Sequence, residues 1–444
     1  MKRVFIANRG EIAVRIVQAC RVLDLECVVG ASEADMGGMA AHLADRVVCI
    51  GPGPAAQSYL RPEVIVQAAL GTKCDAIHPG YGFLSESPRL AGLARENGLT
   101  FVGPPTEAIE LAGDKLAARE QAAQAGAPVL PGGEVASLQA ARALAGEIGY
   151  PLLVKAAGGG GGRGIKRVGD EAELDAVLGL ARSEAGAAFG DDRVYLEKLI
   201  EAARHVEVQV AADEHGHTLH LGERDCSVQR RFQKVVEEAP APALSPDTRA
   251  QLQESAVAFA QRIGYRNLGT AEFVIDAGSG AAYFLEVNCR IQVEHPVTEA
   301  VTGLDLVAMQ LRIADGERLE IDQDDVRVDG HAIECRLNAE DPAHGMRPSP
   351  GTITLFAVPQ RHGLRVDTHC QAGAVVPPYY DSLLAKLIAH GEDRAHAIHV
   401  LLDALEDLDV DGVETNRTLL IGVLGHPDFR DGAVTTTWLE HVLA

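Results

Sequence analysis

No apolar run in this 444-residue sequence approaches the length of about 18 to 20 residues that a helix needs to cross a bilayer. The first apolar stretch, Val4 to Ala7, is short and gives way at once to Asn8, Arg9 and Gly10, which is unlike the apolar core of a secretory signal peptide. These features predict a soluble, cytoplasmic protein without a membrane partner.

Positive charge and paired cysteines are also scarce. Acidic residues number 63 against 40 basic ones, a net charge of −23, so the chain should repel phosphate backbones and not bind nucleic acid non-specifically. The cysteines form no CxxC pair and no Cys/His metal spacing, which predicts reduced, mostly buried thiols. They are Cys20, Cys27, Cys49, Cys74, Cys226, Cys289, Cys335 and Cys370.

Two common nucleotide-binding signatures are missing. The first turn lacks G-x-G-x-x-G, and no Gly-Lys-Ser/Thr closes the later glycine run, so neither the dinucleotide fingerprint nor a Walker A loop is present. Strand-like runs nevertheless alternate with helical patterns, at residues 4–7, 25–29, 75–78 and 99–102. This alternation predicts a parallel, doubly wound sheet over about the first 110 residues.

The remaining chain is too long for one hydrophobic core, so two or three subdomains are expected. We predict a helix from Ala112 to Gly126, a breaker-rich linker at 127–133 and a compact unit that ends near residue 203. Strand patterns then indicate an α+β domain with antiparallel pairing, and residues 331–444 continue with strands and close on helices. The strand patterns lie at 204–211, 270–275 and 282–287.

Gly158 to Gly162 form the most conspicuous motif, and Lys155 lies just before it at the end of a strand-like run. Adjacent glycines allow backbone N–H groups to approach a ligand closely, although a flexible linker has the same composition. In Tyr195 to Ile200, Glu197 and the backbone of Lys198 and Leu199 could hold an adenine edge, or form a solvated face.

Glu272, Glu286 and Asn288 occupy two strand-like stretches that alternate apolar and polar residues. If the strands are neighbours, these side chains can share one face. Carboxylate and amide oxygens suit Mg²⁺, which bridges substrate phosphates. Ordinary solvent-facing polar residues would produce the same pattern.

Arg290, Gln292 and Glu294 also alternate, and should project to one side. An arginine fork binds a small planar anion such as bicarbonate, and a nearby carboxylate can remove its proton. A surface salt bridge is the alternative. Basic groups at 204–205 and 229–234 indicate a polyphosphate site or, alternatively, a solvated basic face.

Together these residues make the chain resemble the biotin carboxylase family, the ATP-grasp component of acetyl-CoA carboxylase and of related biotin-dependent carboxylases. The resemblance covers nearly the whole length. It rests on motifs that occur in one order, at residues 6–12, 77–86, 113–115, Lys155 with the glycine run, 223–227, 234–240, 290–299, 334–342 and 377–382.

The resemblance implies both a fold and an activity. The expected fold combines α/β and α+β parts. These are a Rossmann-like N-terminal domain at 1–112, linker helices and the ATP-grasp lid at 113–203, the ATP-grasp catalytic domain at 204–330 and the biotin carboxylase C-terminal domain at 331–444. The implied enzyme is a ligase that carboxylates biotin with ATP and bicarbonate through carboxyphosphate. This is the first half-reaction of acetyl-CoA carboxylase in fatty acid synthesis, or of a related acyl-CoA or keto-acid carboxylase.

The resemblance also implies a role for each site residue. Glu294 is the general base, Arg336 stabilises the biotin enolate, and Arg290 and Lys234 assist. Bicarbonate contacts Lys234, Arg290, Gln292 and Val293, and biotin contacts Tyr81, Gly82 and Arg336. The metal, Mg²⁺ or Mn²⁺, is held by Glu272, Glu286 and Asn288. ATP contacts Lys115, Lys155, Gly160, Gly161, Gly162, Glu197, Lys198, Leu199, His205, Gln229, Gln233, Glu272, Val274 and Glu286.

Three departures from the family pattern qualify these expectations. Phe232 stands where relatives usually carry a polar residue, so Phe232→His should lower the KM for ATP unless Phe232 is a core residue. At the usual homodimer interface, Gln18, Val22 and His362 replace charged or aromatic residues. The resemblance therefore supports the homodimer less strongly than it supports the fold. No Met-Lys-Met biotinylation motif is present, which implies a separate biotin carrier protein and carboxyltransferase subunits.

Two other functions fit parts of the sequence. A different ATP-grasp ligase, such as a carbamoyl-phosphate or purine-pathway enzyme, would have no need of Arg336 in its Cys335-to-Asn338 setting. A non-catalytic ATP-binding regulator would be free to lose Glu294 or Arg290, and the chain keeps both.

Overall fold

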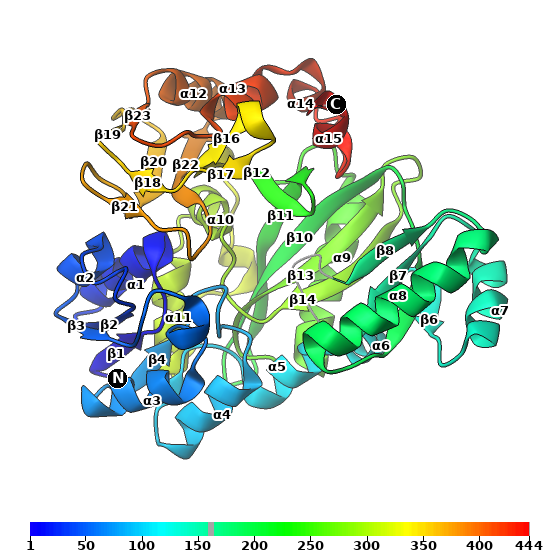
Figure 1. The fold of residues 1–444 in the computed structure, drawn as a ribbon, viewed down its shortest axis with the longest axis horizontal. Coiled ribbons are helices and arrows are strands. Elements are labelled where there is room, and N and C mark those ends of the chain that lie inside the picture. Colours follow the sequence, from blue (N-terminus) through cyan, green and yellow to red (C-terminus); the bar gives the residue numbers. More distant parts are fainter. Residues whose placement is uncertain (159–163, 444) are drawn as a thin grey trace.

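A computed structural model of the protein describes residues 1–158 and 164–443. Figure 1 shows a parallel sheet at the lower left, a small sheet at the right and the C-terminal helices at the top. A long antiparallel sheet runs between these parts and carries most of the residues of the candidate site.

The N-terminal residues form a five-stranded parallel sheet in the order β3-β2-β1-β4-β5, which confirms the predicted doubly wound unit. Val4, Phe5 and Ile6 of β1 are fully buried because helices cover both faces. The strands are β1 (Arg3–Ile6), β2 (Glu26–Ala31), β3 (Arg46–Cys49), β4 (Ala76–His78) and β5 (Thr100–Phe101). The helices are α1 (Gly10–Val22), α2 (Met39–Leu43), α3 (Pro62–Gly71) and α4 (Pro88–Glu96). The sequence did not predict β3, a half-exposed edge strand.

The helix predicted from Ala112 to Gly126 is wrong in its bounds. Two helices occupy this region, α5 (Thr106–Gly113) and α6 (Lys115–Gln124). Asp114 separates them, since its carboxylate accepts hydrogen bonds from the N–H groups of Leu116 and Ala117 at 3.0 and 3.1 Å. This N-cap starts α6 afresh and places Lys115 in its first turn.

A four-stranded antiparallel sheet, in the order β6-β9-β7-β8, forms the small unit. Its elements are β6 (Gly132–Glu134), α7 (Leu138–Ile148), β7 (Leu152–Ala156), β8 (Ile165–Val168), α8 (Glu171–Phe189) and β9 (Val194–Lys198). Both helices pack against the sheet through a shared hydrophobic cluster. The glycine run connects β7 to β8, and Gly160, Gly161 and Gly162 lie outside the described residues.

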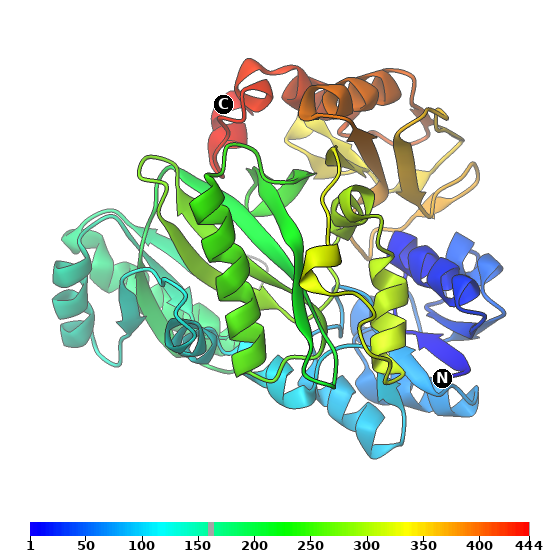
Figure 2. The same cartoon turned by 180° about the vertical axis from the view of Figure 1, so that it is seen from behind.

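The large sheet has eight antiparallel strands in the order β14-β13-β10-β11-β12-β15-β22-β20. Their bounds are β10 (Ala203–Ala212), β11 (Thr218–Arg230), β12 (Gln233–Ala239), β13 (Asn267–Asp276), β14 (Ala282–Asn288), β15 (His331–Asn338), β20 (Leu364–Thr368) and β22 (Leu383–Gly391). Three of these strands come from residues after 330, so one sheet joins the central and C-terminal parts. Figure 2 shows α9 (Pro246–Arg262) lying across this sheet, where it packs on β10 and β11.

Two further helices lie beside the large sheet. They are α10 (His295–Thr302), which contacts β11 and β15, and α11 (Leu306–Ala314), which contacts α1 and β13. The C-terminal part adds α12 (Arg394–Glu406), α13 (Arg417–Gly425), α14 (Pro427–Arg430) and α15 (Trp438–Leu443). Short strand pairs complete it: β16 (Glu340–Asp341) with β17 (Arg347–Pro348), β18 (Gly351–Thr352) with β21 (Val375–Val376), and β19 (Leu355–Ala357) with β23 (Asp409–Asp411).

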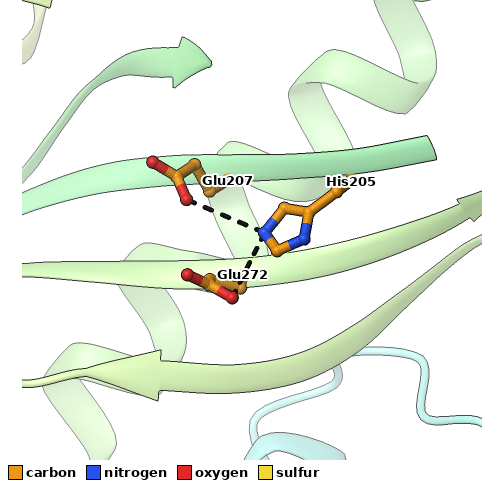
Figure 3. Close-up of side chains that lie close together, drawn as sticks. All are labelled: His205, Glu207 and Glu272. Carbon is orange, nitrogen blue, oxygen red and sulfur yellow. Dashed lines mark ion pairs between the residues drawn. The ribbon is translucent and has the colours of Figure 1, made fainter. Parts of the chain in front are cut away.

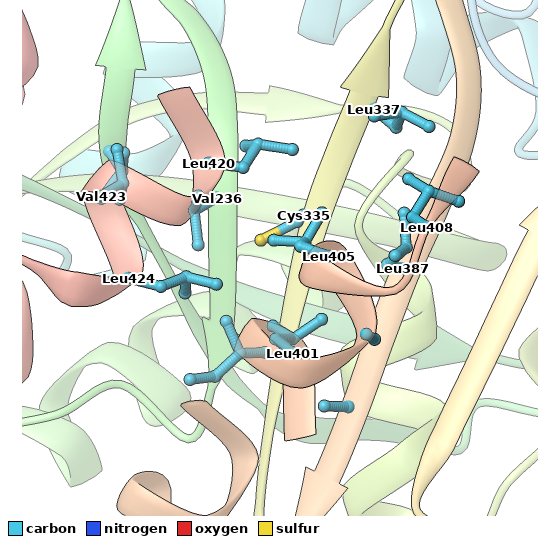
Figure 4. Close-up of a cluster of buried hydrophobic side chains, with 14 of the residues drawn as sticks. Val236, Cys335, Leu337, Leu387, Leu401, Leu405, Leu408, Leu420, Val423 and Leu424 are labelled. Atoms are coloured by element: carbon cyan, nitrogen blue, oxygen red, sulfur yellow. The ribbon is translucent and has the colours of Figure 1, made fainter. Parts of the chain in front are cut away.

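A hydrophobic core fills one face of β15 and β22. Cys335, Leu337 and Leu387 point into it, where they meet leucines of α12 and α13 (Figure 4). Because side chains alternate along a strand, Glu334 and Arg336 project from the opposite face. This alternation turns charged residues of the C-terminal part toward the candidate site.

The cysteines agree with the sequence prediction. Every cysteine is a free thiol, and all except Cys49 are buried. Within residues 1–158 and 164–443, no helix combines the length and the apolar character required to span a membrane.

Candidate active site

Lys234, on β12, lies at the centre of a group of buried carboxylates. Its ammonium nitrogen donates hydrogen bonds to Glu207, Glu272 and Glu294 at 2.6, 3.0 and 2.6 Å. Burial disfavours the charged lysine, but these carboxylates outweigh that cost and raise the pKa of Lys234 well above its usual value. Lys234 is therefore a fixed positive charge in this site.

Glu294, at the start of α10, lies between two cations. Its two oxygens accept hydrogen bonds from different residues: Oε1 from Lys234 at 2.6 Å, and Oε2 from Nη2 of Arg336 at 2.9 Å. Burial alone would favour the protonated acid, but Lys234, Arg336 and Arg224 hold the pKa of Glu294 well below its usual range. The Glu294 side chain is fully buried and carries a negative charge at neutral pH.

Arg336, on β15, also binds a second carboxylate. Its Nε atom donates to Glu237 at 2.6 Å. Burial and the nearby Glu294 raise the pKa of Glu237 to about 7, against the opposing effect of Arg336. One guanidinium thus joins an ionised carboxylate to one that titrates near neutral pH.

Behind this group lies Arg224, the largest of the fully buried side chains. It donates to Glu207 at 2.6 Å and to Gln209 and Thr298 at 2.9 and 3.0 Å. The sequence patterns indicated no role for Arg224, Glu207 or Glu237. For Glu207, the sequence of β10 contained a usable signal, because polar and apolar residues alternate along it. The structure buries this whole strand.

His205, on β10, lies between two carboxylates, as Figure 3 shows. Its Nε2 atom is 3.2 Å from Glu272 and 3.8 Å from Glu207, and its Nδ1 atom is 3.1 Å from Nε2 of Gln229. His205, Glu207 and Glu272 could together hold a metal ion. Burial opposes the charge of the imidazole, but Glu272 raises the pKa of His205.

The predicted metal ligands lie on neighbouring strands. Glu272 of β13 is paired in register with Glu286 of β14, and the amide nitrogen of Asn288 donates to Glu272 at 2.7 Å. Glu286 forms an ion pair with Lys115. Despite burial, Lys234 and His205 lower the pKa of Glu272, so this carboxylate is ionised.

Residues 289–294 connect β14 to α10 and carry the predicted bicarbonate site. Arg290 donates to Gln292 at 2.8 Å, to Asn288 at 3.0 Å and to Glu86 at 3.1 Å. Gln292 in turn donates to Glu272 at 3.3 Å. The backbone carbonyl of Val293 accepts a hydrogen bond at 2.9 Å from Lys386 of β22, in the C-terminal part of the chain.

The predicted ATP residues divide between two groups. Lys115 of α6 and His205 of β10 form ion pairs with Glu286 and Glu272 of the large sheet. Lys155 instead forms an ion pair with Glu197 in the small sheet. The remaining residues lie at the edges of these groups. Lys198 donates to the carbonyls of Gly149 and Tyr150, Leu199 and Val274 are half-buried, and Gln233 is exposed.

Tyr81 and Gly82, the predicted biotin contacts, line a cavity of about 130 Å³ between the N-terminal and C-terminal parts. The hydroxyl of Tyr81 donates to Glu11 of α1. Gly82 has a φ of +67°, a left-handed conformation that favours glycine, and a side chain there would meet nothing within 4 Å. The backbone of Gly82 is therefore open to an approaching ligand.

Phe232 lies at the tip of the hairpin between β11 and β12. With Arg231 it forms a two-residue turn in which both residues have positive φ, +49° and +64°. The Phe232 side chain is 65% exposed, so the alternative that it is a core residue is wrong. Turns of this kind favour Asn or Gly, because other side chains are strained at positive φ.

We expect Phe232→Asn to raise the melting temperature by about 1 to 3 °C, because asparagine tolerates the left-handed turn. If residue 232 also contacts the nucleotide, a regained hydrogen bond should lower the KM for ATP about fivefold without changing kcat. Differential scanning fluorimetry and steady-state kinetics measure the two effects.

Val375→Asn is the control, since Val375 is also 65% exposed but lies in a strand. A gain in stability no larger than that of the control would contradict the turn-strain argument. An unchanged KM for ATP would remove residue 232 from the nucleotide site.

Three family models match successive parts of the chain. Residues 1–109 match the biotin carboxylase N-terminal domain, and residues 334–441 match the biotin carboxylase C-terminal domain. Residues 114–322 match the ATP-binding domain of the carbamoyl-phosphate synthase L chain, which relates the middle of the chain to one of the rival enzyme classes. Both flanking matches favour the biotin carboxylase resemblance over that rival.

Whole-length comparisons agree. The chain is 50% identical to a biotin carboxylase of Pseudomonas aeruginosa, over 100% of this chain and 99% of that protein. Its fold is similar to the biotin carboxylase domain dimer of the Hydrogenobacter thermophilus 2-oxoglutarate carboxylase in complex with MgADP, ADP and bicarbonate. The TM-score is 0.96 at 46% identity, covering 100% of this chain and 98% of that one. A Campylobacter jejuni biotin carboxylase complexed with β,γ-ATP also gives a TM-score of 0.96, at 42% identity and over 99% and 98% of the two chains.

Proposed function

The chain belongs to the biotin carboxylase family, and we propose that it uses ATP and bicarbonate to carboxylate biotin on a carrier protein. One observation carries the proposal beyond family membership. The ionised, fully buried carboxylate of Glu294 is held between Lys234 and Arg336, next to the loop that presents Arg290. These contacts support Glu294 as the base, Arg290 as the anion-binding residue and Arg336 as the cation for an enolate.

The first step forms carboxyphosphate. Glu294 takes the proton of bicarbonate, a bicarbonate oxygen attacks the γ-phosphorus of ATP, and the bond to ADP breaks. Lys234 and Arg290 offset the negative charge that develops in the transition state. Burial keeps bulk water away from carboxyphosphate, which would otherwise hydrolyse.

Lys234 also controls the strength of the base. While Lys234 and Arg336 both bind Glu294, its low pKa makes it a weak proton acceptor. The phosphate oxygens of ATP compete for the Lys234 ammonium, and loss of that hydrogen bond raises the proton affinity of Glu294. The base is therefore activated by the substrate that it serves.

The second step transfers the carboxyl group. Carboxyphosphate releases CO₂ and phosphate, and the phosphate accepts the N1′ proton of biotin. Arg336 stabilises the resulting enolate through charge-assisted hydrogen bonds, and N1′ attacks CO₂. We expect biotin to occupy the cavity that Tyr81 and Gly82 line.

The residues of the metal site fit Mg²⁺ or Mn²⁺. Glu272 and Glu286 are paired on adjacent strands, Asn288 contacts Glu272, and all offer the hard oxygen donors that such ions require. A bound ion would neutralise charge on the β- and γ-phosphates of ATP. We expect Lys115, which is paired with Glu286, and His205, which lies near Glu272, to bind the same phosphates.

The partners follow from the family and the sequence. We propose a separate biotin carboxyl carrier protein and separate carboxyltransferase subunits, which choose acetyl-CoA, another acyl-CoA or a keto acid as the final acceptor. We include a homodimer among the proposed assemblies, because Gln18, Val22 and His362 are all exposed and accessible to a second copy of the chain. We place the reaction in the cytoplasm, as the sequence predicts.

Phosphate release by the purified chain tests the proposal. ATP cleavage should require both bicarbonate and Mg²⁺, and free biotin should increase its rate. Each component is omitted in turn, with ¹⁴C-bicarbonate incorporation into biotin measured in parallel. Equal rates in all mixtures, or cleavage without labelled carboxybiotin, would contradict the assignment.

A further inference from the structure

Lys386, on β22, is a fully buried cation that the steps above do not use. Its ammonium donates to the backbone carbonyl of Val293 at 2.9 Å and lies 3.1 Å from Oε1 of Glu11. Burial opposes its charge, but Glu11, Glu334 and Asp367 raise the pKa of Lys386, so it is protonated at neutral pH. A charged donor thus holds the peptide that precedes the general base.

The position of Lys386 on the sheet explains this contact. β15 and β22 pair so that Lys386 lies directly opposite Arg336. Both side chains project from the face opposite the hydrophobic core of Figure 4, into which Cys335 and Leu387 point. Arg336 binds the carboxylate of Glu294, and Lys386 binds the carbonyl of Val293. Two neighbouring residues of one strand pair thus hold two consecutive residues of the catalytic loop.

The contact to Val293 constrains Glu294 directly. The Val293 carbonyl belongs to the peptide that joins Val293 to Glu294, and a planar peptide has no internal freedom. Fixing the Val293 carbonyl oxygen fixes the orientation of the Glu294 backbone. It therefore also fixes the direction in which the Glu294 side chain projects. A displacement of about 1 Å at a reacting group can cost about 10²-fold in rate.

We propose that Lys386 is a positioning residue for the bicarbonate step, which it serves by holding the Val293–Glu294 peptide in register with Lys234 and Arg336. It acts through Glu294 and touches neither ATP nor biotin. This proposal rests on the proposed function, because bicarbonate deprotonation by Glu294 is the step that it supports.

Charge balance is the competing explanation for Lys386. Glu11 is also buried, so Lys386→Met alone would leave an unpaired carboxylate and could unfold the protein. The double variant Lys386→Met/Glu11→Gln removes one charge of each sign, while Asp367 keeps its two 2.7 Å hydrogen bonds from Arg365. Glu11→Gln alone is the matched control, since it preserves the Lys386–Val293 hydrogen bond.

Bicarbonate-dependent ATP cleavage is measured without biotin, because Glu11 also contacts Tyr81. We expect the double variant to melt within a few degrees of wild type, keep its KM for ATP within about twofold and lose roughly 10- to 100-fold in kcat/KM for bicarbonate. Glu11→Gln should retain that activity within about threefold. Lys386→Gln/Glu11→Gln is a second charge-balanced variant, should the first fail to fold.

The outcomes separate the two proposals. A folded double variant with wild-type kcat/KM for bicarbonate would show that Lys386 only balances charge, and would overturn the positioning role alone. A loss shared equally with Glu11→Gln would overturn it too. Absence of bicarbonate-dependent cleavage in the wild type would overturn the proposed function and the inference together.

Discussion

Glu294→Gln should reduce kcat for bicarbonate-dependent ATP cleavage by about 10² to 10⁴, the usual contribution of a general base. The amide can still accept a hydrogen bond from Lys234 or Arg336, but it cannot take the proton of bicarbonate. Carboxylation of biotin should fall by at least as much, because it consumes the product of this step. Phosphate release and ¹⁴C-carboxybiotin formation measure the two losses.

Glu334→Gln is the matched control for this experiment. Glu334 is also fully buried on the same sheet, but burial and nearby Glu237 raise its pKa well above the usual value despite Lys386. Glutamine is nearly isosteric with the protonated acid, which this raised pKa favours, and should preserve activity. If both variants lost activity equally, the loss in Glu294→Gln would reflect a disturbed fold and not a missing base.

Arg336→Ala should abolish most biotin carboxylation, by about 10² to 10³, because it removes the donors for the biotin enolate oxygen. ATP cleavage should fall much less, since the variant keeps Glu294, the proposed base, with Lys234 beside it, and keeps Arg290, which we propose binds bicarbonate. The ratio of carboxybiotin formed to ATP cleaved therefore drops. Arg336→Lys retains the charge without the forked guanidinium, so its ratio should lie between those of the wild type and Arg336→Ala.

The pH profile of Arg336→Ala provides an independent check. Arg336 helps to hold the pKa of Glu294 below its usual range, so its removal raises that pKa. Glu294 must be ionised to act as a base, so the acid limb of the ATP-cleavage profile should move to higher pH, with full activity only above the raised pKa. An unshifted limb, or defects identical to those of Glu294→Gln, would contradict this division of roles.

Local sequence patterns predicted much of the fold. The N-terminal parallel sheet, the strands of the central part and the free, mostly buried thiols are all confirmed. The predictions failed where a single residue or an exposed sheet edge changed the structure that the hydrophobic pattern indicated. Asp114 divides one apolar-periodic stretch into two helices, and β3 at the sheet edge is too exposed to read as a buried strand. The positive φ of Phe232 could not be read from its neighbours.

The sequence by itself determined the family and the identity of Lys234, Glu294 and Arg336, because these residues lie within motifs that occur in a fixed order along the chain. Predicted ATP-binding residues in the small sheet, such as Lys155 and Glu197, were named with equal ease, because each belongs to a recognisable local segment.

Only the tertiary structure decided which charges meet. Lys234 is 27 residues from Glu207 and 60 from Glu294, and Lys386 is 93 residues from Val293. The register of the antiparallel strands and the burial of one sheet face select these contacts, and both depend on pairings between distant segments. A buried charge is stable only beside its partner, so the strand pairing that forms the sheet also completes the site.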